Sequence, residues 1–175
     1  MSTGTILLPI GAADLPDGSA SNLAADIKKV KSSAAAPTPY FKHALFDASN
    51  REQLMWSFRM PADYASAPVM RVQFKMASAI TGNVVIEARI AATSPGDSTD
   101  LDAKAFAAAN TSAATAVPTT TAGKLGEISL ALANADSLAA GDFVTVYFAR
   151  DAAHASDTAT GDMEVVAVAL TYTTT

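Results

Sequence analysis

Apolar and polar residues alternate with a period of two through most of the chain from Tyr40 onward. In VMRVQFKM, residues 69–76, every second residue after the first is apolar, and charged or amide side chains lie between them. This alternation places apolar atoms on one face of an extended strand, as in a half-buried antiparallel sheet. NVVIEARI (83–90) and GEISLALA (126–133) repeat the pattern. The sequence therefore predicts a series of one-sided strands.

Two strand pairings are expected from the links between these segments. The turn Thr81-Gly82-Asn83 suits a hairpin between the first two strands. FVTVYFAR (143–150) is apolar on both faces, which is typical of a central strand, and EVVAVALTY (164–172) is its expected neighbour.

The predicted fold class is all-β. Further strands are expected at 40–46 and 53–60, with a short one at 101–106, and almost no amphipathic helix follows residue 40. Seven or eight one-sided strands bury their apolar faces most simply as an antiparallel β-sandwich. A jelly-roll-like order fits the strand count, and an immunoglobulin-like order is the alternative.

The first 39 residues differ from the rest, because they show no sustained period and contain four prolines. We expect two parts: an extended N-terminal arm at 1–39 and a β-sandwich domain at 40–175. The only helical pattern in the arm lies at 22–30. The arm either lacks fixed structure or is ordered by a neighbouring molecule that covers its apolar ILLPI patch at 6–10.

Candidate partner contacts are therefore placed in this arm. They combine its apolar residues with a lysine cluster, the densest positive charge in the chain, which either meets an acidic partner or keeps the arm solvated. The set is Ile6, Leu7, Leu8, Ile10, Leu15, Lys28, Lys29 and Lys31.

Composition narrows the possible partners. The chain of 175 residues has a net charge of −5, which argues against nucleic-acid binding by counterion release. It contains no cysteine, so disulfides and thiolate metal sites are excluded. No apolar run reaches membrane-spanning length, and the N-terminus lacks the pattern of a signal peptide. We expect a soluble protein made in the cytoplasm, with protein or sugar partners.

The chain offers little catalytic chemistry. His43 lies in a strand pattern and is interpreted as structural, and no Gly-x-Ser-x-Gly motif accompanies His154. Aspartates cluster at 97–102 and 151–162, where they offer oxygen ligands to calcium or, more commonly, cap turns. Trp56 and Tyr64 suit a sugar-stacking platform, although a tryptophan in a strand more commonly belongs to the core. We expect no enzyme activity, no cofactor and no bound metal.

Two segments carry a resemblance to a known group of proteins. The stretch at 46–76 contains a W-x-F-x-x-P-x-x-Y pattern formed by Trp56, Phe58, Pro61 and Tyr64. The stretch at 138–172 has a Gly-Asp turn, a strand, an Arg-Asp pair, a loop with a further aspartate and a terminal strand. Together they resemble small virion proteins of tailed bacteriophages.

This resemblance implies a non-enzymatic structural protein of the capsid decoration or cement type, or a head-fibre module. It implies a homotrimer on the capsid exterior, with the major capsid protein or other virion proteins as partners and no nucleic acid or membrane. A receptor- or glycan-binding fibre module is the main alternative, and a hydrolase on a sandwich scaffold is the second.

Overall fold

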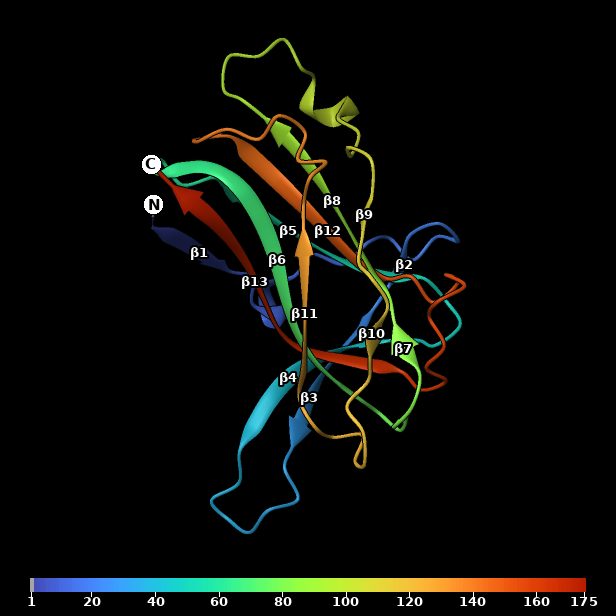
Figure 1. Ribbon diagram of the computed structural model, residues 1–175. Helices are drawn as coiled ribbons and strands as arrows, with labels where there is room; N and C mark the ends of the chain where they lie inside the picture. Colours follow the sequence, from blue (N-terminus) through green and yellow to red (C-terminus); the bar gives the residue numbers. More distant parts are fainter. Residues whose placement is uncertain (1) are drawn as a thin grey trace.

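The computed structural model describes residues 2–175 as two sheets packed face to face, so the expected all-β sandwich is confirmed (Figure 1). The six-stranded sheet contains β1 (Thr3–Leu7), β3 (Asp26–Lys31), β4 (Tyr40–Phe46), β6 (Tyr64–Met76), β11 (Gly126–Ala131) and β13 (Met163–Thr174). The five-stranded sheet contains β2 (Leu23–Ala24), β5 (Glu52–Arg59), β8 (Ile86–Thr93), β9 (Asn110–Thr111) and β12 (Phe143–Arg150). A two-stranded pair, β7 (Asn83–Val84) with β10 (Thr115–Ala116), and two short 3-10 helices, η1 (Ile10–Ala12) and η2 (Leu101–Ala103), complete the described elements.

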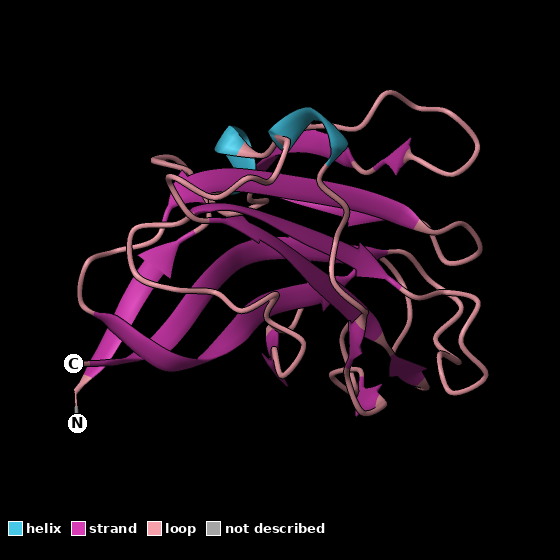
Figure 2. Ribbon diagram, turned by 90° about the horizontal axis from the view of Figure 1, so that it is seen from above, coloured by secondary structure: helices cyan, strands magenta, loops and turns pink. Residues whose placement is uncertain are grey.

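From β4 onward, the strands of six or more residues alternate between the two sheets. The orders are β11-β6-β13-β4-β3, with β1 also on β13, and β2-β5-β12-β8-β9. The pairs are antiparallel except for β2 with β5. This alternation gives the jelly-roll-like arrangement, and Figure 2 shows the two layers edge on.

Both expected strand pairings are wrong. The chain after β6 crosses to the other sheet, so β6 and β8 are not neighbours. Likewise β12 lies between β5 and β8, whereas β13 belongs to the six-stranded sheet. A link that crosses between sheets places two consecutive one-sided strands with their apolar faces toward each other, which buries both faces at once.

The core fills the space between the sheets. Phe46 of β4 meets Phe148 of β12 edge to face, with ring centroids 5.1 Å apart. Trp56 is buried, which confirms the interpretation that it belongs to the core, and its indole Nε1 donates a hydrogen bond to the carbonyl of Pro9 at 3.0 Å. Tyr64 is also buried and its ring packs against Tyr172.

The N-terminal segment is part of this body. β1 pairs with β13 from Thr3↔Thr173 to Leu7↔Ala169, and β3 pairs with β4. The expected extended arm and the boundary at residue 39 are therefore wrong for the described residues, and the helix expected at 22–30 is replaced by β2 and β3. The physical reason is that β1 covers an edge of β13, a partner more than 160 residues away in sequence, which satisfies its backbone groups.

β13 changes partner part-way along its length. Residues Met163–Val165 pair with β4, whereas the pairing with β1 begins only at Ala169. An irregularity between Val165 and Ala167 in the register with β6 marks this point. One edge of β13 therefore pairs first with β4 and then with β1, and a short unpaired stretch separates the two partners. We call this branching of the sheet the fork.

Candidate docking surface

The expected partner contacts in the first 15 residues separate into buried and exposed sets. Leu8 and Ile10 are only 2% and 4% exposed, and Ile6 packs against the core, so these three residues are structural. Leu7 points the other way and is 73% exposed, and Leu15 is exposed too. Because side chains alternate along a strand, one strand end carries both a core contact and an outward leucine.

The lysine cluster lies on β3, the last strand of its sheet. Lys28, Lys29 and Lys31 are all exposed, and β3 pairs with β4 to form a hairpin that extends beyond the sandwich (Figure 1). The register places Lys29 opposite Lys42 and Lys31 opposite Tyr40. Because directly paired residues share a face and neighbours in a strand alternate, Lys29, Lys31, Tyr40 and Lys42 lie on one face of the hairpin, and Lys28 and Phe41 lie on the other. We call the first set the hairpin face.

The hairpin face is the electropositive part of an acidic protein. Residues 26–46 contain four lysines and one aspartate, whereas the whole chain has a net charge of −5. Asp26 contacts Lys28 at 3.1 Å, and Lys29 lies 4.8 Å from the centre of the Tyr40 ring. Exposed contacts of this kind contribute little to folding, so the lysines remain available for a partner.

An apolar hollow, here called the fork groove, lies where β13 changes partner. It has a volume of about 360 Å³ and joins the end of β1 to the base of the hairpin. Leu7 forms one side, Phe41 and Lys42 form the other, and Val166 and Ala167 line the strand between them. Two of these side chains, Leu7 and Phe41, are 73% and 38% exposed. Large apolar side chains grouped beside a hollow are typical of an interaction site.

His43 and two charged residues form a buried cluster at the base of the hairpin. The Nδ1 of His43 lies 2.9 Å from the Glu164 carboxylate, which also contacts Lys75. Burial lowers the pKa of His43, and the ammonium groups of Lys75 and Lys28 add to this effect. A neutral ring that donates its Nδ1 hydrogen to Glu164 satisfies the geometry, in agreement with a structural histidine.

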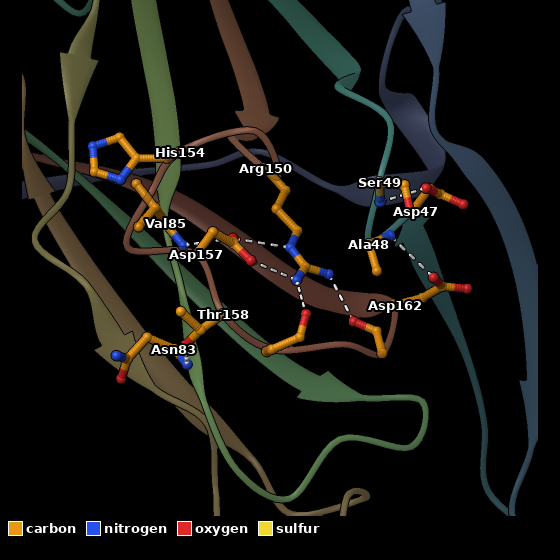
Figure 3. A network of polar contacts seen from close by, with 12 residues as sticks. Asp47, Ala48, Ser49, Asn83, Val85, Arg150, His154, Asp157, Thr158 and Asp162 are labelled. Atoms are coloured by element: carbon orange, nitrogen blue, oxygen red, sulfur yellow. Dashed lines mark hydrogen bonds and ion pairs between the residues drawn. The ribbon is translucent and has the colours of Figure 1, made fainter.

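The aspartates of the loop at 151–162 hold the loop itself together (Figure 3). Arg150, which is fully buried, donates to both carboxylate oxygens of Asp157 at 2.7 and 3.1 Å and to the carbonyls of Ala159 and Gly161. Asp157 also accepts from the Val85 amide at 2.9 Å. Both carboxylate oxygens of Asp157 therefore already accept hydrogen bonds within the protein.

Two further loop aspartates also accept backbone hydrogen bonds. Asp162 accepts a hydrogen bond from the amide of Ala48 at 3.2 Å. In the other acidic loop, Asp100 caps η2 by accepting from the Asp102 amide. Within residues 2–175 no group of three or more His, Cys, Asp or Glu side chains is arranged to hold a metal ion. Asp100 therefore caps a turn, whereas Asp157 and Asp162 join their loop to other parts of the chain.

Some residues of the docking surface can be found from the sequence and others cannot. The lysine cluster is evident from its charge density, whereas the sequence predicts only a strand for Tyr40, Phe41 and Lys42. Their place beside the lysines and the fork groove follows from the pairing of β4 with the edge strand β3.

No helix within the described residues has the length and apolar character needed to cross a membrane.

Comparison with known proteins gives likenesses of fold only. No protein-family model matches the chain, and no curated protein is similar to it in sequence. The K1 cleaved adhesin domain of Lys-gingipain from Porphyromonas gingivalis is 11% identical, with a TM-score of 0.45 and coverage of 97% of this chain and 98% of that one. The family 11 carbohydrate-binding module from Clostridium thermocellum is 10% identical, with a TM-score of 0.41 and coverage of 96% and 87%.

A viral protein is also similar at this level. The chain from the structure of infectious bursal disease virus, Gx strain, is 9% identical with a TM-score of 0.42, and the match covers 97% of this chain but 31% of that one. At these identities and TM-scores the likenesses assign no activity, ligand or partner to this chain.

Proposed function

We propose that this protein is a non-enzymatic structural component of a tailed-phage particle, of the capsid decoration or cement type. It binds an acidic surface of the major capsid protein, or of another virion protein, on the outside of the shell. Docking uses the hairpin face and the fork groove in place of a free arm. The observation that carries the proposal is a projecting lysine-rich hairpin, on an otherwise acidic protein, beside an apolar groove.

The two parts of this surface contribute in different ways. Lysines at the rim attract an acidic surface over a distance and align it, while exposed apolar side chains in the groove supply most of the binding free energy. A protein that binds only the assembled shell shifts the assembly equilibrium toward it. Many copies on one shell therefore stabilise the particle without any chemical step.

The test is co-sedimentation of the purified protein with shells of the phage that encodes it. Lys31→Glu is compared with Lys124→Glu, which makes the same charge change at another exposed lysine outside the hairpin. We expect Lys31→Glu to weaken binding about fivefold, because reversal of one rim charge costs on the order of 1 kcal/mol. Lys124→Glu should bind like the wild-type protein.

Ionic strength and particle composition provide the second measurement. Because exposed charges are screened by salt, wild-type occupancy should fall between about 0.05 and about 0.5 M salt. Mass spectrometry of purified virions should find the chain in many copies per particle. Its absence from virions, together with no binding to shells, would exclude the proposed function; equal occupancy of the two lysine variants would exclude only the hairpin.

The resemblance to trimeric phage proteins also supports a homotrimer as the docking unit. Light scattering during size-exclusion chromatography should then give three times the 17.9 kDa chain mass. A monomeric mass would exclude the homotrimer but would not affect the proposed docking surface.

A further inference from the structure

The outer face of the five-stranded sheet carries a second, chemically different surface. The segment from η2 to Phe106 follows the loop at the end of β8 (Figure 1) and lies against this face. The ring of Phe106 packs on Tyr147 of β12, with centroids 5.8 Å apart. Arg89 of β8 approaches the same tyrosine ring at 5.8 Å. Aromatic side chains from a loop and a strand therefore meet on one face.

A cleft of about 210 Å³ opens on one side of Phe106. It is lined by Thr93, Leu101, Lys104, Phe106, Phe143 and Thr145. Phe143 is 42% exposed and Leu101 is 52% exposed, so an apolar rim faces water. An aromatic ring left this open presents a flat apolar face on which another ring can stack.

One hydroxyl in this cleft has no partner within residues 2–175. The Oγ1 of Thr93 is buried, and among the side-chain nitrogen and oxygen atoms of the described residues it alone combines burial with no hydrogen bond. Its neighbours in the cleft are already engaged: Thr145 pairs with Ser57 at 3.1 Å, and Lys104 pairs with Asp136 at 2.8 Å. An unpaired buried hydroxyl is costly, so a ligand that supplies a hydrogen-bonding group here gains free energy.

A second hollow of about 230 Å³ lies on the other side of Phe106 and is more polar. Tyr147, Arg89 and Gln53 line it, together with Asn22. Arg89 contacts Glu87 at 2.6 Å, and Arg51, which also lines this hollow, contacts the same carboxylate and lies 4.0 Å from Asp151. Each hollow is smaller than the roughly 300–1,000 Å³ of a drug-sized pocket, so each suits one ring of a chain better than a large compact ligand.

We infer that this face binds a neutral oligosaccharide, with one sugar ring stacked on Phe143 beside Thr93 and the next unit beyond Phe106. A pyranose combines a flat apolar face with a rim of hydroxyls, which matches an exposed phenyl ring next to an unpaired hydroxyl. Lys104 is paired with Asp136, and the two arginines of the polar hollow share two carboxylates, Glu87 and Asp151, so no positive charge is in excess to select an anionic ligand. This site is separate from the proposed docking surface, which lies on the six-stranded sheet.

The test is a glycan array followed by isothermal titration of the full chain. The titration probes are β-1,4-galactotriose, a β-1,3-1,4-mixed-linked tetrasaccharide and any soluble oligosaccharide that the array selects. We expect the wild-type protein to bind at least one probe. Phe143→Ala should weaken that binding about tenfold, because truncation of a stacking ring removes more than about 1 kcal/mol.

Two further variants make the result specific. Thr93→Val keeps the side-chain shape and should weaken binding about fivefold through loss of one hydrogen bond. Leu125→Ala removes an apolar side chain outside the cleft that is even more exposed than Phe143, and it should bind like the wild-type protein. No wild-type binding to any glycan, or unchanged binding by Phe143→Ala with its circular dichroism intact, overturns the inference. Shell co-sedimentation is unaffected by either outcome, so the two proposals fail independently.

Discussion

The outer faces of the two sheets differ in the side chains they present. On the six-stranded sheet, exposed apolar residues of the outer face border the fork groove, and the nearby lysines lie on a hairpin that projects beyond the sandwich, with Lys29, Lys31 and Lys42 on the face that continues the inner side of the sheet. On the five-stranded sheet, the charges are paired and aromatic rings surround two small hollows. The first arrangement suits a broad charged protein surface, and the second suits a small uncharged ring.

This difference shows how a sandwich separates stability from recognition. The inner faces are apolar in both sheets and form one core, whereas each outer face is free to carry its own chemistry. Two ligands of different kinds can then be bound by one body without a shared residue. The following experiments test that separation, starting with the one that should affect both faces.

Arg150→Met should give the largest effect. Arg150 belongs to β12, and its partner Asp157 lies in the loop that leads to β13 in the other sheet. Removal of one member of a buried ion pair leaves the other without compensation, at a cost of about 3–5 kcal/mol. Urea unfolding should show this loss. Arg59→Met, at an exposed arginine of β5, is the control and should change stability by no more than about 0.5 kcal/mol.

Leu8→Ala and Leu7→Ala test whether the N-terminal segment belongs to the body that supports both faces. Leu8 is buried and Leu7 is exposed, although they are adjacent in sequence. We expect Leu8→Ala to cost about 2–5 kcal/mol and Leu7→Ala to cost less than about 0.5 kcal/mol in the same unfolding assay. Equal small effects would mean that the segment is detached in solution.

The most direct test of separate faces is to measure each binding variant in the assay for the other ligand. Phe143→Ala should leave shell binding unchanged, and Lys31→Glu should leave oligosaccharide binding unchanged. Each variant should lower only its own binding, by about tenfold for Phe143→Ala and about fivefold for Lys31→Glu, if the two side chains contribute about 1.4 and about 1 kcal/mol to one ligand alone. If either variant lowers both, the two faces are coupled or the variant has disturbed the core.

His43→Gln should reveal the smallest effect, a pH dependence confined to the base of the hairpin. Burial, with Lys75 and Lys28, lowers the pKa of His43 below its ordinary value of about 6.5. The unfolded chain therefore binds a proton more readily than the folded one, so stability falls as the pH drops below about 6.5. Unfolding curves between about pH 7.5 and about pH 5.5 should show a shallower decline in His43→Gln than in the wild-type protein. An identical decline would mean that other groups account for it.

The sequence predicted the strands more reliably than their partners. β4, β5, β6, β11, β12 and β13 fall where the period of two placed them. Alternation is a local property, so a single segment is enough to detect it. Pairing depends on the path of the chain between sheets, and Thr81-Gly82-Asn83 looks like a hairpin turn although it belongs to a crossing link.

The N-terminal segment was misjudged for a related reason. β1 has only five residues, and its apolar neighbours Leu8 and Ile10 appear exposed until β13 and Trp56 are placed against them. The aromatic cleft also cannot be predicted locally, because the one tryptophan, Trp56, lies in the core and residues 101–103 form a 3-10 helix in place of the expected strand at 101–106. Phe106 and Phe143 are separated by a long stretch of chain, and only the fold brings them near the same cleft.

The position of the lysines on β3 has a further consequence. A strand at the end of a sheet exposes unpaired backbone groups, which invite strands of other molecules to add on and so promote aggregation. Lys28, Lys29 and Lys31 place positive charge along this edge, which makes such stacking between copies unfavourable. The lysines proposed to recognise a shell therefore also oppose edge-to-edge association between copies of the protein. A variant in which all three are neutralised should aggregate more readily.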